Sequence, residues 1–220
     1  MVVHMDGRFI LRTKFINNDI IKMESIEIVR KQISASACVK EALLRDEQVL
    51  RQIAYAAEVC TKAYREGHKT LFAGNGGSAA DAQHLAGEFV SKFYFDRPGI
   101  PSIALTTDTS IITAIGNDYG YDKLFARQVQ AQGNTGDIFI GISTSGNSEN
   151  IVKALPVCRE KGIITIALTG SSPCKMDEFD IVIKVPSMET PRIQECQTLI
   201  GHIICCIVEE NIFGNLKMME

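Results

Sequence analysis

Residues 73–88, AGNGGSAADAQHLAGE, contain two groups of side chains and turns that could do chemistry. The stretch opens with a turn of three glycines, which lack the Cβ atoms that would keep the backbone away from a ligand. It ends with His84 and Glu88, which are four residues apart and therefore lie on one face of a helix. The first group suits a phosphate and the second suits a divalent metal ion.

The glycine-rich turn favours a phosphate over a nucleotide. Gly76 and Gly77 lead into a predicted helix, with Ser78 placed to cap it and Asp81 three residues on, and a helix start attracts negative charge. The turn also satisfies the relaxed dinucleotide fingerprint GxGxxG/A, which is a weak signal by itself. No acidic residue clearly ends a second strand about 20 residues on, and the GK[ST] of a Walker loop is absent.

A second polar loop, STSGNSEN at residues 143–150, follows the third of five apolar runs. Hydroxyls combined with free backbone N–H groups at a helix N-terminus can bind a phosphate monoester without a lysine. We favour this interpretation over an ordinary capped turn, which would explain one such residue but not four. The loop's hydroxyls belong to Ser143, Thr144, Ser145 and Ser148. Capping and turn formation adequately explain the polar segments 106–110 and 116–120.

The last helical stretch supplies partners for His84 and Glu88. Gln194 and His202 are eight residues apart, which returns to roughly the same side of a helix. His202 lies in the apolar segment GHIICCIV, where a buried histidine needs a partner. Taken separately, the first pair is more simply a solvated surface pair, and a lone buried histidine is usually satisfied by a carbonyl oxygen. Together the four side chains form a suitable zinc ligand set, provided that the two helices meet.

An alternation of apolar runs and helical stretches after Gly67 predicts the elements that position these residues. Each run is apolar or β-branched at consecutive positions and is bounded by Gly, Pro, Asp or Thr, as in strands buried on both faces of a parallel sheet. We therefore predict a doubly wound α/β fold, whose ligand site lies outside the carboxyl ends of the strands. Five strands are expected at 69–74, 100–106, 136–143, 162–170 and 180–186, with crossover helices over 78–95, 109–132 and 148–161.

Two helices are predicted to precede this core, over residues 23–66. Ile26, Val29 and Ile33 recur at helical spacing, and a second apolar stripe follows from Val49 to Cys60. Such stripes pack on the core or on a second copy of the chain, and the latter is a usual route to oligomers. We expect one domain over 23–220, with the helices 23–66, an α/β core 67–190 and a C-terminal helix 191–214; residues 1–22 form an extension of unknown role.

The composition indicates one folded cytoplasmic domain. The chain has 220 residues, of which 45% are hydrophobic, and a net charge of −3 that provides no basic field for nucleic acid. Its seven cysteines form no CxxC pair, which fits a reducing compartment, and Cys196 is expected in the core. No apolar run reaches the roughly 20 residues of a bilayer span, and the N-terminus lacks a secretion signal. We expect no membrane and no nucleic acid as a partner.

Five motifs, in order along residues 23–214, make the sequence resemble the sedoheptulose 7-phosphate isomerases, or phosphoheptose isomerases, of the SIS (sugar isomerase) superfamily. The resemblance implies a flavodoxin-like SIS fold and a cytoplasmic homotetramer with active sites between subunits. It implies conversion of sedoheptulose 7-phosphate to D-glycero-D-manno-heptose 7-phosphate, the first step towards the heptose of bacterial surface polysaccharides such as lipopolysaccharide. The motifs are AGNGGSAADAQHLAGEF, RPGIPSIALTTDTS, GNDYGYDKLFARQV, GISTSGNSEN and TPRIQE with the later GH.

The resemblance also implies residue roles. One zinc ion per subunit would be bound by His84, Glu88, Gln194 and His202. Isomerisation moves a proton between C1 and C2 while an enediolate is stabilised, so it needs a base, an acid and positive charge near the oxygens. We assign Glu88 as the base, and His202 as the group that donates to oxygen or delivers the proton on the opposite side. The sugar phosphate would be held by Asn75, Gly76, Gly77, Glu88, Asn117, Asp118, Ser143, Thr144, Ser145, Ser148 and Gln194.

Other functions of the same superfamily remain as alternatives. One is a noncatalytic tetramer that associates with a replication initiator, although a scaffold has no requirement for the His, Glu, Gln and His set. Another is a sugar phosphate sensor, which usually accompanies a DNA-binding module that is not visible here. A different sugar isomerase or an etherase is the nearer enzymatic alternative. One departure from many relatives is Gln197, which stands where they have a second histidine.

Overall fold

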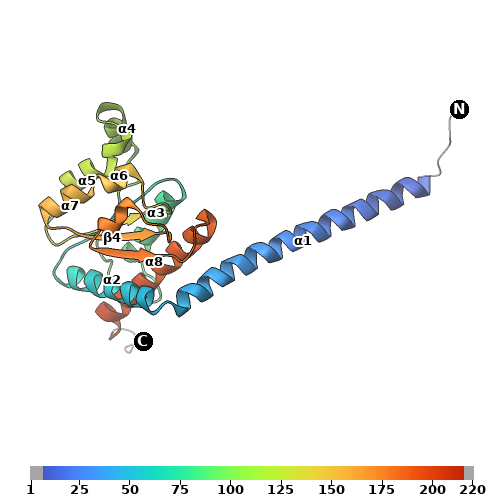
Figure 1. The fold of residues 1–220 in the computed structure, drawn as a ribbon. Helices are drawn as coiled ribbons and strands as arrows, with labels where there is room; N and C mark the ends of the chain where they lie inside the picture. The colour runs from blue at the N-terminus through green and yellow to red at the C-terminus, as the bar shows by residue number, and fades with distance from the viewer. Residues whose placement is uncertain (1–6, 216–220) are drawn as a thin grey trace.

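A computed structural model describes the backbone of residues 7–215 and the side chains of residues 23–215 (Figure 1). Its centre is one parallel sheet with the strand order β2-β1-β3-β4-β5. This is a doubly wound order whose switch point lies between β1 and β3, as in flavodoxin-like folds. The predicted fold class is confirmed, and every strand lies inside its predicted range. The strands are β1 (Thr70–Gly74), β2 (Ser102–Ala104), β3 (Ile138–Ile142), β4 (Ile164–Thr169) and β5 (Ile181–Lys184).

Helices cover both faces of the sheet (Figure 1). On one face α2, α3 and α8 pack against the sheet, and on the other α4 to α7 do so. The predicted crossovers correspond to α3, to α4 with α5, and to α6 with α7. The helices are α1 (Gly7–Arg45), α2 (Glu47–Arg65), α3 (Gly77–Val90), α4 (Thr109–Asp118), α5 (Leu124–Gln132), α6 (Glu149–Val152), α7 (Leu155–Lys161) and α8 (Thr190–Phe213), with the 3-10 helices η1 (Tyr121–Lys123) and η2 (Lys175–Glu178).

Alternate residues of the central strands enter two different cores. In β3, Ile138 and Ile140 pack under α2, α3 and α8, while Phe139 packs under α5 and α7. All five residues of β3 are buried. Burial on both faces explains why the strands appear in the sequence as continuous apolar runs rather than as alternating ones.

The first two helices differ in what covers their apolar stripes. Val49 and Ile53 of α2 are buried in the core, and Asp46 caps this helix by accepting the backbone N–H groups of Gln48 and Val49. The stripe of α1 is open: Ile33 is 65% exposed, and α1 projects away from the α/β body (Figure 1). The helix also begins at Gly7, well before the predicted start at residue 23, since 8–22 contain neither Pro nor a further Gly.

The final helix α8 is the central helix of one core. Its length of 24 residues and its apolar composition would also allow it to cross a membrane, and it is the one helix of the described residues that meets these criteria. In this fold α8 packs against α2, α3 and β4, and it carries the buried, ion-paired Glu209. These features are typical of a core helix of an α/β domain. Cys196 of α8 is buried, as predicted.

Candidate functional site

The site forms where α3 and α8 run side by side in the same direction. Asp81 of α3 accepts a hydrogen bond from the Thr198 hydroxyl of α8, at 3.0 Å. One turn further on, Leu85 lies where a side chain at Gly201 would be, because a Cβ there would come within 2.4 Å of the Leu85 Cδ2 atom. A glycine at this position therefore lets the two helices approach closely. The next residue of α8 is His202.

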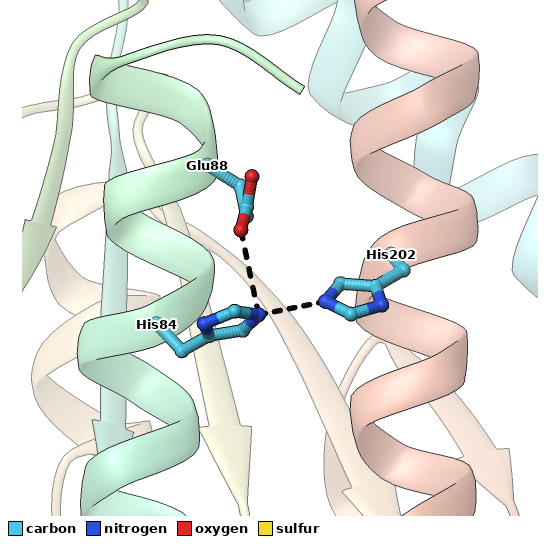
Figure 2. A group of neighbouring side chains, drawn as sticks. All are labelled: His84, Glu88 and His202. Atoms are coloured by element: carbon cyan, nitrogen blue, oxygen red, sulfur yellow. Dashed lines mark hydrogen bonds and ion pairs between the residues drawn. The ribbon is translucent and has the colours of Figure 1, made fainter. Parts of the chain in front are cut away.

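Three potential metal ligands converge between the two helices (Figure 2). The Nε2 atoms of His84 and His202 lie 2.7 Å apart, and His84 Nε2 lies 3.4 Å from a carboxylate oxygen of Glu88. The ligand atoms of all three residues are within 4.8 Å of one another. His202 is half-buried and finds its polar partner in the other histidine rather than in a backbone carbonyl. The helix contact that the sequence analysis required is present.

The surroundings support these three side chains. The Phe93 ring lies against the His202 ring, with 5.5 Å between centroids. Burial raises the pKa of the Cys205 thiol, one turn after His202, and the Glu88 carboxylate raises it further. Two imidazoles and one carboxylate are donors that zinc commonly takes, so this group can hold a divalent metal ion.

Gln194, the fourth predicted ligand, lies two turns before His202 and faces the first turn of α3. A Cβ atom at Gly77 would lie 2.9 Å from Gln194 Nε2, so the amide packs directly on the glycine. The structure thus brings Gln194 beside the glycine-rich turn, while the two histidines and Glu88 meet deeper along the same helix pair.

The glycine-rich turn has a backbone that requires glycine. Gly76 is the N-cap residue of α3 with φ of +56° and ψ of −121°, a conformation in which a Cβ atom is strained. The prediction that Ser78 caps the helix is wrong. Ser78 lies inside the first turn and is buried, no side-chain cap is formed, and Asp81 binds Thr198 instead. The helix start therefore keeps its backbone N–H groups without a side-chain cap.

The serine loop, residues 143–150, joins β3 to α6 at the same edge of the sheet. The hydroxyls of Ser143 and Ser148 lie 2.9 Å apart, and the Ser145 hydroxyl accepts the Asn147 N–H at 3.2 Å. Thr144 is half-buried and Ser145 is exposed. A neighbouring element also binds the loop, because the backbone N–H of Lys175 in η2 donates to the Asn147 side chain. It is therefore both a hydrogen-bonded turn and a cluster of hydroxyls.

Asn117 and Asp118 end α4 and are exposed. The amide of Asn117 donates to the Asp118 carboxylate at 2.8 Å, so the two side chains engage each other. Figure 1 shows α4 at the outer tip of the α/β body, beyond the helices that carry the histidines. The structure does not join these two residues to the cluster between α3 and α8.

Sequence analysis missed a buried ion pair that connects the end of α3 to α8. The side chains of Arg97 and Glu209 are each 1% exposed, with Nε and Oε1 2.9 Å apart. Arg97 also donates to the carbonyl oxygen atoms of Glu88 and Phe89 at the end of α3. The motif RPG had contained this arginine, but its partner lies 112 residues away. The pair holds the backbone of Glu88 against the helix that carries His202.

The amide of Asn75 is likewise engaged by residues that sequence analysis did not assign to the site. Asn75 forms two hydrogen bonds with Asn150 and one with Tyr121. Asn150 stands in the quoted motif GISTSGNSEN, but nothing in its local sequence indicated a partner 75 residues away.

Comparison with known proteins places this architecture in a family. The model of the SIS domain matches residues 39–170. The phosphoheptose isomerase of Aneurinibacillus thermoaerophilus is 64% identical over 190 residues, which are 86% of this chain and 96% of the relative. Phosphoheptose isomerase 2 of Campylobacter jejuni is 66% identical over 187 residues, which are 84% of this chain and 93% of the relative.

Solved structures agree with the sequence relatives. A phosphoheptose isomerase from Francisella tularensis is 37% identical with a TM-score of 0.80, and one from Neisseria gonorrhoeae is 39% identical with a TM-score of 0.78. Each comparison covers 84% of this chain and 98% of the other. The match to the SIS domain and these relatives show that the chain belongs to the phosphoheptose isomerase family of SIS-domain proteins.

Proposed function

We propose that this chain isomerises sedoheptulose 7-phosphate to D-glycero-D-manno-heptose 7-phosphate, the first step of bacterial heptose precursor synthesis. The observation that carries the proposal is the convergence of Glu88 and His202 from two parallel helices, one of which begins at the glycine-rich turn. A carboxylate and an imidazole so placed are the base and the acid that an aldose–ketose isomerisation needs. The relatives that are 64% and 66% identical carry the name of this activity.

In the proposed reaction Glu88 removes a proton from C1 of the ketose. The electrons of the broken C–H bond form the C1–C2 double bond of an enediolate, and the carbonyl oxygen at C2 takes up the charge. His202 protonates that oxygen, or delivers a proton to C2 from the opposite side. If His202 protonates the oxygen, Glu88 returns its proton to C2 and His202 takes the proton of the C1 hydroxyl. If His202 protonates C2, the C1 hydroxyl passes its proton to the oxygen at C2, and Glu88 gives its own proton back to His202 through water. Either route completes the aldose. His84 lies between these two groups and contacts both.

We propose zinc as the metal, with His84, Glu88, Gln194 and His202 as its ligands, one ion per subunit. Zinc would supply positive charge next to the carbonyl oxygen of the substrate. The donor types favour it, since two imidazoles and a carboxylate converge here and no thiol does so among the described residues. Without metal, the 2.7 Å contact between the two Nε2 atoms is a hydrogen bond in which one ring donates and the other accepts.

The phosphate is assigned to the glycine-rich turn and the serine loop. The N-terminus of α3 has no side-chain cap, and we propose the N–H groups of Gly76 and Gly77 as donors to an anion, since those of Ser78 and Ala79 already donate to backbone carbonyl oxygens. The remaining contacts to the sugar phosphate are proposed for Asn75, Glu88, Asn117, Asp118, Ser143, Thr144, Ser145, Ser148 and Gln194.

We further propose a cytoplasmic homotetramer with active sites between subunits. Two features support an assembly: the apolar stripe of α1 has no cover in the single chain, and the His84 side chain is 47% exposed beside the site. A partner subunit would also bring a second copy of Asn117 and Asp118. The seven free cysteines fit a reducing compartment. Residues 23–220 are proposed as one SIS domain, with 1–22 as an extension of unknown role.

The proposal is tested by incubating the zinc-supplemented protein with sedoheptulose 7-phosphate and following the aldoheptose 7-phosphate by NMR. We expect conversion by the wild type and none by Glu88→Gln or His202→Ala. His68→Ala is the matched control and should leave turnover unchanged, because His68 precedes β1 and so lies at the amino end of the strands, opposite to the site. A folded, zinc-loaded protein that makes no aldose would contradict the proposed function.

A further inference from the structure

The glycine-rich turn and the serine loop are joined by a reciprocal pair of amides. Asn75 Nδ2 donates to Asn150 Oδ1 at 2.9 Å, and Asn150 Nδ2 donates back to Asn75 Oδ1 at 2.8 Å. Asn150 is only 3% exposed, whereas Asn75 is half-buried. Paired hydrogen bonds between two planar amides leave little rotational freedom, so the buried Asn150 fixes the plane of the half-buried Asn75 amide.

A third hydrogen bond reaches Asn75 from a different element. The hydroxyl of Tyr121, at the start of η1, donates to Asn75 Oδ1 at 3.0 Å. The segment that carries Tyr121 is itself held against α6, since Asp122 accepts a hydrogen bond from Lys153. Three loops at the carboxyl edge of the sheet therefore meet at one amide.

The hydrogen-bonding capacity of Asn75 then determines what it can offer a ligand. An amide oxygen accepts two hydrogen bonds, and here both come from the protein, from Asn150 and Tyr121. The amide nitrogen donates two, of which one goes to Asn150. What remains is a single N–H donor.

We infer that Asn150 is a positioning residue, which together with Tyr121 fixes the Asn75 amide so that it presents one N–H donor, and no acceptor, to the substrate. This inference rests on the proposed function, in which Asn75 contacts the sugar phosphate. The chemical class recognised is an oxygen acceptor, such as a phosphate oxygen or the lone pair of a hydroxyl. Neither Asn150 nor Tyr121 needs to touch the substrate.

The test is the variant Asn150→Asp, which keeps the shape of the side chain. Above the pKa of the new carboxyl group, an unprotonated oxygen takes the place of Asn150 Nδ2 and faces Asn75 Oδ1, so the hydrogen bond between them is lost. KM should then rise on the order of tenfold, with a smaller change in kcat. When that group is protonated, its O–H replaces the missing donor, and KM should return to the wild-type value. Burial raises the pKa of a carboxyl group, so we expect this recovery as pH falls from 8.5 towards 5.5.

The measured quantity is the ratio of variant to wild-type kcat/KM at each pH, which removes the pH dependence of the rest of the enzyme. Asn134→Asp is the matched control, because Asn134 is exposed and lies just before β3, at the amino end of the strands. Its kcat/KM ratio to the wild type should stay near one at every pH. Tyr121→Phe removes one hydroxyl only and should raise KM severalfold at every pH. This second variant keeps the inference testable if Asn150→Asp does not fold.

The outcomes separate the inference from the proposed function. A low ratio that recovers at low pH supports the positioning role. A ratio near one, or a low ratio that does not change with pH, overturns it, since a merely structural defect would not be repaired by one proton. If the wild type shows no turnover, binding of sedoheptulose 7-phosphate is measured by calorimetry instead. Binding without turnover contradicts the proposed function, and the pH dependence of binding by Asn150→Asp then decides the inference.

Discussion

The Nε2 atoms of His84 and His202 lie 2.7 Å apart, although the two residues are separated by 118 positions in the chain. The contact exists because α3 and α8 run parallel and close together, with Gly201 opposite Leu85. The two histidines belong to helices that are far apart in the sequence, and they meet because the order of the strands places both helices on the same face of the sheet. The following predictions test what this arrangement does.

Removal of either histidine should abolish tight zinc binding. Removal of a residue that only hydrogen-bonds to a metal ligand weakens metal affinity roughly 10- to 100-fold. We expect His84→Ala and His202→Ala to weaken zinc affinity by more than this. Competition with a chromogenic chelator would measure the affinity. His68→Ala should bind zinc like the wild type, and equal zinc affinity in all three variants would mean that the site lies elsewhere.

Replacement of Glu88 by glutamine should remove the base without removing the fold. The side chain is partly exposed and the change preserves its shape, so the melting temperature should move little. Turnover should fall by at least about 10²–10⁴-fold, the range for loss of a general base. The NMR assay described above measures it, and full activity in a folded Glu88→Gln protein would exclude Glu88 as the base.

Addition of one methyl group at Gly77 should displace Gln194. The new Cβ atom would lie 2.9 Å from Gln194 Nε2, which is the end of a flexible side chain and can move. We therefore expect Gly77→Ala to change KM or zinc affinity severalfold while the free energy of unfolding changes little. Gly87→Ala is the control on the same helix, since its Cβ would meet nothing within 4 Å. Identical kinetics in both variants would contradict a role for Gln194.

The buried pair of Arg97 and Glu209 should matter more to stability than any surface pair. Removal of one partner leaves a charge buried without compensation, which costs about 3–5 kcal/mol. Urea unfolding of Arg97→Met should show this loss. Arg51→Met breaks an exposed pair with Glu47 on α2 and should cost less than about 1 kcal/mol. Similar losses in the two variants would show that burial of the first pair is unimportant.

Stability should fall at high pH because of Cys60. Burial raises the pKa of this thiol from 9.0 to about 12, so the folded state keeps the proton that the unfolded chain loses. The contribution to stability is complete below pH 9 and is lost, at about 1.4 kcal/mol per pH unit, as the pH rises towards 12. Unfolding experiments between pH 8 and 10.5 should give a shallower slope for Cys60→Ala than for the wild type. The exposed Cys38→Ala should keep the wild-type slope.

Local sequence determined which segments become strands and helices. Five apolar runs bounded by turn residues correspond to β1 to β5, because strands buried on both faces must be apolar at consecutive positions. Helical spacing placed His84 with Glu88, and Gln194 with His202, on common faces of their helices. Glycines at 76 and 77, and hydroxyls from 143 to 148, marked the two loops, since both features depend on backbone conformation or composition within a few residues.

Only the tertiary structure decided which of these groups meet. The parallel contact of α3 with α8 joins His84 to His202, and in the same contact the Thr198 hydroxyl donates to Asp81. The buried partners of Arg97 and Asn75 lie 112 and 75 residues away along the chain. Periodicity reports which side of an element is apolar, but the partner on that side depends on the order of strands and the packing of helices, which no short stretch of sequence contains.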